Sequence, residues 1–314
     1  MSPRAFVRSP WFGPLLALIL VYALFSALAP DTFLASANLW TMARQTVVVA
    51  IAAVGMTYVI LLGGIDLSVG SAVAITTVVV AALLRQDAGL AAAVVCAVAV
   101  PTLVGACTGA LVARLAITPF IVTLGTMSLL RGTAKGLADE QKIDADPHGL
   151  DTLMTAPAPG EWSLPAGVAI AVLVAAVAEV ALRHTVFGRH VTAIGSNENT
   201  ARLCGVPVTR VKVFVYGLSG LLAGLAGIME FATLTVGDPT DSIGLELEVI
   251  AAVVIGGGSL SGGQGSVVGA MVGALLMTVI KTGCTHIGLP NWVQEILTGA
   301  IIVIAVAMDR LRKR

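Results

Sequence analysis

Charged residues are scarce in this chain of 314 residues. Lysine, arginine, aspartate and glutamate make up only 11% of it, while 57% of the residues are hydrophobic and the mean hydropathy is +0.96. A soluble domain carries roughly 25% charged residues, because water must wet its surface. This sequence has too few polar residues to cover a water-soluble surface, so much of the surface must face lipid.

Three further features are missing. The formal net charge is +0, and a nucleic-acid surface needs an excess of positive charge, so we expect no nucleic-acid partner. The four cysteines lack paired spacing, which indicates neither a disulfide framework nor a zinc site. No G-x-x-x-x-G-K-[ST] motif for binding phosphate occurs. We therefore expect no catalytic residues, cofactor or metal in this chain. If the protein moves a solute across the membrane, the energy for that movement must come from another chain or an ion gradient.

Long apolar runs are present instead, and runs such as residues 11–29 and 88–113 contain no charge. A membrane barrel would show alternating segments of about ten residues, so unbroken runs favour helices. Apolar segments are separable at about 11–29, 46–64, 67–84, 89–113, 116–134, 165–182, 213–230, 243–258, 264–281 and 291–308. We predict an all-α polytopic integral membrane protein with about ten transmembrane helices, forming a single domain over residues 1–314.

Positive charge falls unevenly on the predicted loops. If both termini are cytoplasmic, twelve of the 18 lysines and arginines lie inside and six lie outside, which favours this orientation over its inverse. The loop at about 136–164 is then external and acidic, while the loop at about 183–212 is cytoplasmic and basic.

Two glycine-rich breaks separate predicted spans 2 and 3 and predicted spans 8 and 9. In the first, Gly63 and Gly64 are suited to ending a helix, and Asp66 or Ser68 can accept hydrogen bonds at the start of the next. One interpretation is that Asp66 is only such a cap. The alternative is that it belongs to a gate in a path for solute, because a buried carboxylate in a membrane is costly and usually functional. The second break reads LSGGQ at 260–264, the signature string of ABC ATPases. We interpret it as a coincidence within a membrane hairpin, because no phosphate-binding motif accompanies it.

A short helix is predicted in the basic loop. Asn197 or Ser196 can cap its start, Glu198 suits its positive end, Arg202 lies one turn further, and Gly205 stops it. So short a helix is marginal alone, which favours docking on a partner, although an ordinary solvated loop is the alternative.

Few polar residues fall in or beside the predicted spans: Gln45, Thr123, Thr126, Ser128, Glu179, Glu230, Glu246, Glu248, Gln294 and Glu295. We expect Glu179 to pair with Arg183 one turn away. Glu246 and Glu248 are either interfacial or pore-lining. The candidate translocation path or gate comprises Gln45, Gly63, Gly64, Asp66, Ser68, Thr123, Thr126, Glu246 and Glu248. Ion-driven carriers usually place acidic or histidine residues in mid-span, and none is evident here.

Four stretches of the sequence stand out: GGIDLSVGS at 63–71, TPFIVTLGTM at 118–127, residues 188–205, and AAVVIGG at 251–257. In these stretches the chain resembles the permease family of ribose, xylose and galactose ABC importers. The resemblance implies a multi-pass subunit of the bacterial cytoplasmic (inner) membrane, surrounded by membrane lipid. Its implied partners are an ATPase subunit that binds ATP and Mg, a second permease copy (homodimer or heterodimer), and an extracytoplasmic sugar-binding protein.

The resemblance also implies that residues 195–205 form a helix coupled to the ATPase. The residues concerned are Gly195, Asn197, Glu198, Ala201, Arg202, Leu203 and Gly205. A charge placed at Ala201 is expected to disturb this contact. The implied solute is a pentose or hexose. The alternatives are an ABC permease for branched-chain amino acids or nucleosides, and an ion-coupled secondary carrier.

Overall fold

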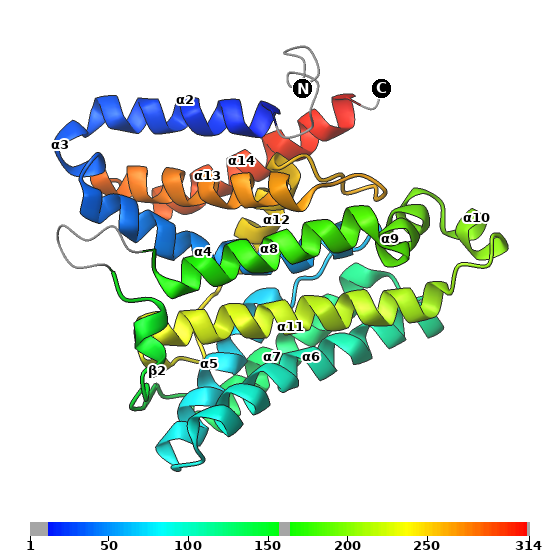
Figure 1. The fold of residues 1–314 in the computed structure, drawn as a ribbon, viewed down its shortest axis with the longest axis horizontal. Helices are drawn as coiled ribbons and strands as arrows, with labels where there is room; N and C mark the ends of the chain where they lie inside the picture. The colour runs from blue at the N-terminus through cyan, green and yellow to red at the C-terminus, as the bar shows by residue number, and fades with distance from the viewer. Residues whose placement is uncertain (1–11, 157–163, 313–314) are drawn as a thin grey trace.

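The computed structural model describes residues 12–156 and 164–312, and most of this length is helical (Figure 1). In chain order the helices are α2 (Phe12–Leu28), α3 (Pro30–Phe33), α4 (Ser36–Leu61), α5 (Val69–Arg85), α6 (Leu90–Arg114), α7 (Pro119–Leu137), α8 (Ala166–His184), α9 (Val186–Ser196), α10 (Glu198–Leu203), α11 (Val208–Leu234), α12 (Leu245–Ile255), α13 (Val267–His286) and α14 (Asn291–Arg312). A 3-10 turn, η1 (Leu150–Leu153), and two strands, β1 (Ile143–Asp144) and β2 (Val236–Gly237), complete the described elements.

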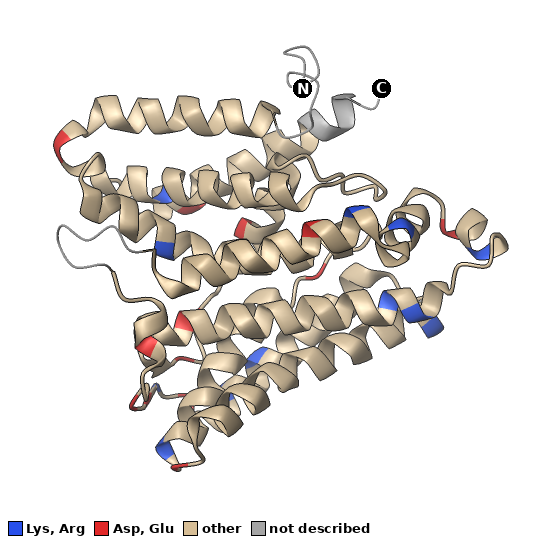
Figure 2. Cartoon of the chain, viewed as in Figure 1, with Lys and Arg blue, Asp and Glu red and all other residues tan. Residues whose placement is uncertain are grey.

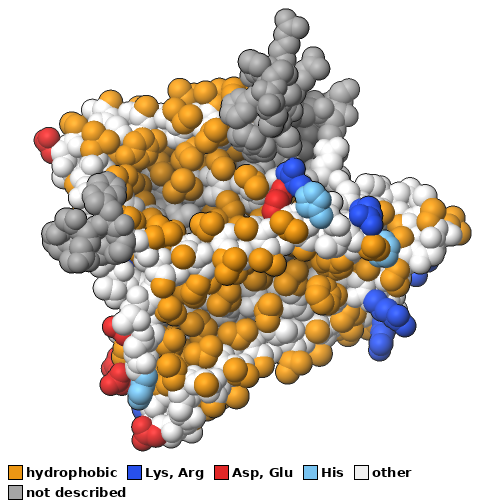
Figure 3. Space-filling view, in the orientation of Figure 1, with side chains coloured by type: hydrophobic (Ala, Val, Ile, Leu, Met, Phe, Trp, Pro, Cys, Tyr) orange, Lys and Arg blue, Asp and Glu red, His pale blue; other side chains and the backbone are white. Residues whose placement is uncertain are grey.

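Several helices have the length and composition of membrane spans. Within the described residues, α4, α6, α8, α11 and α13 are each long and apolar enough to cross a bilayer. Large apolar side chains on the outer helices are exposed, among them Leu20 of α2, Leu103 of α6 and Leu173 of α8. Hydrophobic side chains cover much of the visible face between the two ends of the molecule (Figure 3). The chain is therefore an all-α polytopic membrane protein.

Helix α4 forms the centre of the packing. In its most apolar stretch 83% of the residues are buried, against 22% in α6 and 17% in α8. It contacts α8, α11, α12 and α13, which leaves little of its most apolar stretch for lipid. Close approach of helices depends on glycine, as between α6 and α11: a Cβ atom on Gly109 would lie 2.8 Å from the Cα of Val213. The outer helices, α6 and α8, leave most of their apolar side chains for lipid.

Each predicted apolar segment contains a helix, but several details differ. Helix α12 has only 11 residues and so spans about 16 Å, which is too short to cross about 30 Å of hydrocarbon alone. The prediction of a full span at 243–258 is therefore wrong. Helix α4 begins at Ser36, well before the predicted start near 46. Helix α9 was not predicted, although Phe187, Val191 and Ile194 follow the spacing of a helical face.

The external loop also differs from the irregular cap that the sequence indicates. Its strand β1 pairs antiparallel with β2, with Ile143 opposite Gly237, so the loop is tied to the chain that follows α11. Residues 157–163 of the predicted loop lie outside the described residues.

The molecule has two distinct ends (Figures 1 and 2). We call the end with α9 and α10 the basic end, because lysine and arginine gather there at the helix termini: Arg114, Arg183, Arg189, Arg202, Arg210 and Lys212. The opposite end, with β1, η1 and β2, is called the loop end. Helix α2 runs toward the loop end and α14 runs away from it (Figure 1). The predicted external and cytoplasmic loops thus lie at opposite ends, while the membrane side of each stays a prediction.

Candidate functional site

The two glycine-rich breaks meet at the basic end, beside the last turn of α9. The carbonyl oxygen of Leu61, at the end of α4, accepts a hydrogen bond of 2.9 Å from the N–H of Gly263. A Cβ atom on Gly262 would lie 2.7 Å from the carbonyl oxygen of Gly195 and 3.0 Å from the Cα of Gly63. Gly63, Gly195, Gly262 and Gly263 therefore form one close backbone contact, which we call the glycine junction.

The junction requires glycine at Gly195 for steric reasons. A Cβ atom there would overlap the carbonyl oxygen of Leu61 and lie 2.6 Å from the nitrogen of Gly263. The LSGGQ string contributes Gly262 and Gly263 to this contact, between α12 and α13. Its position fits the interpretation as a membrane hairpin.

Asp66 lies in the first break and is only 3% exposed. Its Oδ1 atom accepts hydrogen bonds from the backbone N–H of Ser68 (3.0 Å) and the Ser68 hydroxyl (2.6 Å). Its Oδ2 atom accepts one of 2.9 Å from the hydroxyl of Ser219 on α11. Ser68 is itself the N-cap residue of α5, so Asp66 holds the break to α11 rather than capping the first turn. Thr123 of α7 donates to the Ile65 carbonyl at 3.1 Å, which holds the break from a second side.

The predicted short helix is confirmed as α10. The Asn197 side chain accepts a hydrogen bond of 2.9 Å from the N–H of Thr200, and Gly205 follows the helix at φ +82°. Glu198 pairs with Arg202 at 2.9 Å and with Lys212 of α11 at 2.7 Å. Burial alone would raise the pKa of Glu198, but the hydrogen bonds and charges of Lys212 and Arg202 together lower it. Helix α10 is therefore fixed to the start of α11 by a charged contact.

The exposed side of α10 carries a large apolar residue. Leu203 is 89% exposed, whereas Ala201 is 4% exposed and belongs to the hydrophobic core. The expectation that Ala201 presents a docking surface is therefore wrong, because a charge there would first disturb the packing of this chain. Asn199, Thr200 and Arg202 of α10 are also exposed, and Leu203 is the apolar residue among those that a partner could contact.

A cavity of about 700 Å³ lies at the loop end, between α4, α11, α12, α13 and α14. Two predicted path residues, Gln45 and Glu248, line it. The Gln45 side-chain oxygen accepts a hydrogen bond of 3.2 Å from Thr282, and Glu248 pairs with Lys281 at 2.9 Å. Glu230 also lines the cavity. Sequence reasoning noted Glu230 only as a polar residue in an apolar run, although that is the available signal for a functional site in a membrane.

The remaining predicted path residues lie elsewhere. Thr126 forms a 3.0 Å hydrogen bond with Thr108 between α7 and α6. Glu246, in the first turn of α12, lies against Gly70 of α5, where a Cβ atom would be 2.5 Å from its Oε2. Gly64 packs against Tyr216 beside the first break. The structure therefore divides the predicted set between the breaks near the basic end, the loop-end cavity and these separate helix contacts.

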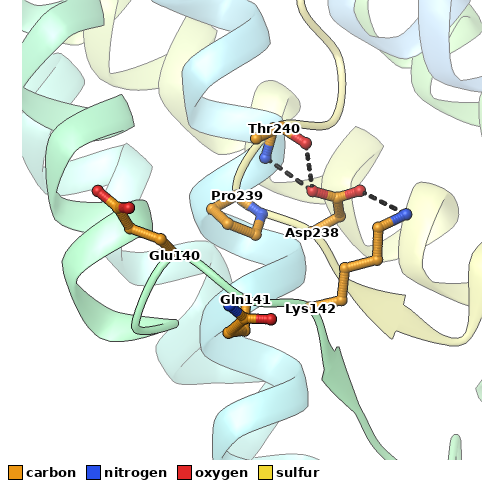
Figure 4. A pocket seen from close by; sticks show the side chains of 6 residues that line it. All are labelled: Glu140, Gln141, Lys142, Asp238, Pro239 and Thr240. Atoms are coloured by element: carbon orange, nitrogen blue, oxygen red, sulfur yellow. Dashed lines mark hydrogen bonds and ion pairs between the residues drawn. The ribbon is translucent and has the colours of Figure 1, made fainter.

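Two ion pairs help to hold the connecting segments. The predicted pair between Glu179 and Arg183 is confirmed, and Glu179 also accepts a hydrogen bond of 3.0 Å from the N–H of Val267, the first residue of α13. At the loop end, Lys142 pairs with Asp238 at 3.0 Å, and Asp238 also accepts hydrogen bonds from Thr240 (Figure 4). Glu140, Gln141 and Pro239 line the shallow pocket around this second pair (Figure 4).

Comparison with known proteins identifies the family. A family model described as "Branched-chain amino acid transport system / permease component" matches residues 38–306. The chain belongs to this permease family. The match includes the glycine junction, Asp66, α9 and α10, and every residue that lines the loop-end cavity. No solved structure matches this permease.

Curated relatives cover this permease over nearly its full length. It is 38% identical to the ribose import permease protein RbsC of Escherichia coli (strain K12), over 100% of this chain and 98% of the relative. It is 34% identical to the L-arabinose ABC transporter permease protein AraH of Azospirillum brasilense, over 96% of this chain and 88% of the relative. It is 35% identical to the fructose import permease protein FrcC of Rhizobium meliloti, over 96% of this chain and 86% of the relative. The role of this permease is transport rather than catalysis.

Proposed function

We propose that this permease is the membrane-spanning subunit of an ABC importer for a small sugar, a pentose or hexose, in the bacterial cytoplasmic membrane. Its relatives support the solute class, because those named above import ribose, L-arabinose and fructose. Its basic end lies in the cytoplasm, in keeping with the charge of the segments gathered there. Its loop end receives the sugar from an extracytoplasmic binding protein.

Coupling to an ATPase is carried by one observation: the exposed helix α10 directly follows α9, whose last turn is packed into the glycine junction. An ATPase that binds ATP and Mg docks on α10 around Leu203. When ATP closes the ATPase, α10 and α9 move, and both glycine-rich breaks must move with them because the backbones are in contact. A second permease copy completes the pathway.

A second candidate solute is a branched-chain amino acid, which the description of the matching family favours. The loop-end cavity is lined by both signs of charge, Arg44 and Lys281 together with Glu230, Asp241 and Glu248, and an amino acid zwitterion would also suit such a lining. The sugar is preferred because full-length relatives carry that name.

The test is uptake by the reconstituted complex. The permease, with its co-expressed ATPase and binding protein, is placed in proteoliposomes with ATP inside or outside, and uptake of labelled ribose, arabinose, fructose and leucine is measured. We expect uptake of at least one sugar that requires ATP and the ATPase. Uptake of leucine alone would replace the sugar proposal with the amino-acid one. Gradient-driven uptake by the permease alone would refute the ABC assignment.

A further inference from the structure

The loop-end cavity exposes a carboxylate that the helix packing does not use. Glu230 lies near the end of α11 and lines the cavity. It has no hydrogen-bond or ion-pair partner within the described part of the chain. The Nε atom of Arg44 is likewise buried without a partner there, although its Nη1 atom donates to the Met154 carbonyl at 2.9 Å. The carboxylate of Glu230 and the Nε–H group of Arg44 are therefore available to bind a ligand from two walls of the cavity.

The cavity extends from the loop end into the start of the span region. On α4 its lining runs from Asn38 to Val49, a rise of about 16 Å along the helix. Val48 and Val49 belong to the apolar segment at 46–64, so the floor of the cavity lies within the span. An acidic side chain at the end of an apolar helix is costly to leave unpaired and normally faces a water-filled path or a polar ligand. A solute in this cavity would satisfy Glu230.

The lining suits a neutral solute with many hydroxyl groups. Each hydroxyl both donates and accepts hydrogen bonds. Glu230 supplies acceptors, and Gln45 supplies amide donors, because its oxygen is already bonded to Thr282. Val48 and Val49 provide an apolar wall for the C–H face of a sugar ring. Arg44 and Lys281 stand against three carboxylates, Glu230, Asp241 and Glu248, in the lining, so the cavity does not favour an anion.

We propose that the loop-end cavity is a solute-binding site of the permease itself, in which Glu230 accepts hydrogen bonds from the hydroxyl groups of a sugar. This proposal rests on the proposed function and deepens it. Solute released at the loop end is held here, above the closed glycine junction, until the basic end opens. The permease thus contributes its own recognition step after delivery.

The experiment compares Glu230→Ala and Glu230→Gln with wild type. Glu295→Ala is the matched control, because Glu295 is an exposed glutamate on α14 that does not line the cavity. ATP-dependent sugar uptake is measured with the full complex. Thermal stabilisation of the purified permease–ATPase complex is measured with millimolar ribose, arabinose or fructose, without the binding protein. Size exclusion and retained ATPase confirm assembly of each variant.

We expect Glu230→Ala to lower the maximal uptake rate about tenfold or more and to abolish stabilisation by sugar, because hydrogen bonds to a charged group are the strong ones. Glu230→Gln keeps one acceptor and should retain intermediate activity, and the control should resemble wild type. Wild-type uptake and stabilisation in an assembled Glu230→Ala complex would overturn the site. If Glu230→Ala does not assemble, Gln45→Ala on the facing wall replaces it, with the same expected loss and the same refuting result. Failure of the wild-type complex to import any sugar would instead refute the proposed function.

Discussion

Substituting Gly195 by alanine places one methyl group in the glycine junction. Its Cβ atom would overlap the Leu61 carbonyl oxygen and lie 2.6 Å from the Gly263 nitrogen, whereas ordinary contact begins at 3.4 Å. The difference, 3.4 minus 2.6, is 0.8 Å, so α9 and the second break must separate by at least that much. If this separation occurs between Leu61 and Gly263, the hydrogen bond of 2.9 Å between them would exceed the distance of about 3.2 Å up to which such bonds persist.

The expected cost combines three effects. Overpacking costs about 1–3 kcal/mol, and the lost hydrogen bond costs about 1 kcal/mol. Alanine is favoured over glycine within a helix by about 1 kcal/mol, which offsets part of this. We therefore expect Gly195→Ala to destabilise the permease by about 1–3 kcal/mol. Uptake should fall further, because the contact that joins α9 to both breaks is disturbed.

The assay is thermal melting in detergent together with ATP-dependent uptake and ATPase retention. Gly125→Ala is the matched control: Gly125 lies within α7, and no atom lies within 4 Å of the position its Cβ would take. The control should be at least as stable as wild type, because alanine is favoured over glycine within a helix, and it should be fully active. Gly195→Ala should melt lower and lose most uptake while still retaining ATPase on α10. Equal melting and equal uptake for the two variants would refute the reasoning about the junction.

Three further predictions address other contacts. Leu203→Glu should leave melting unchanged but reduce the ATPase that co-purifies, and full retention would contradict docking on α10. Asp66→Ala leaves the buried N–H of Ser68 without an acceptor and should cost about 1–3 kcal/mol, whereas Asp66→Asn keeps an acceptor; equal melting would argue against this hydrogen-bond role. Burial alone would raise the pKa of Asp238, but hydrogen bonds from Thr240 and Lys142 lower it overall. The contact between Asp238 and Lys142 therefore stabilises the fold above pH 3.8, and this stabilisation is lost as the pH falls through the lowered pKa. Lys142→Ala should therefore lower melting slightly at neutral pH, by less than about 1 kcal/mol because Lys142 is exposed, and a difference that persists near pH 2 would contradict it.

Features fixed by local chemistry could be predicted from the sequence. The membrane class follows from composition, and the positions of most helices follow from apolar runs. The start and end of α10 follow from Asn197 and Gly205, because a cap and a left-handed glycine act within a few residues of the chain. The pair between Glu179 and Arg183 is predictable for the same reason, since it lies within one helical turn.

Features that depend on distant contacts could not be predicted. The glycine junction joins Leu61, Gly195 and Gly263, and no local pattern indicates that these segments meet. Burial of Ala201 escaped prediction because a helix of six residues is too short to show which face is apolar. Asp66 lies in the first glycine-rich break, whereas Gln45 and Glu248 line the loop-end cavity, and this separation likewise depends on how the helices pack. A list of polar residues within spans cannot sort them by the end of the molecule to which they belong.

The loop-end cavity also has an electrical consequence. In the orientation proposed above, a water-filled cavity would bring the outside potential to its floor, near Val48 and Val49. The membrane voltage would then fall mainly across the buried segment from Ala50 to Leu61 of α4, where the field would be stronger than in an undivided bilayer. A neutral sugar experiences no force from this field. Asp66 lies just beyond that segment, and moving one full charge across the whole potential involves about 2.3 kcal/mol per 100 mV. Opening of the basic end, if it shifts this carboxylate, would therefore be a voltage-dependent step in the transport of an uncharged solute.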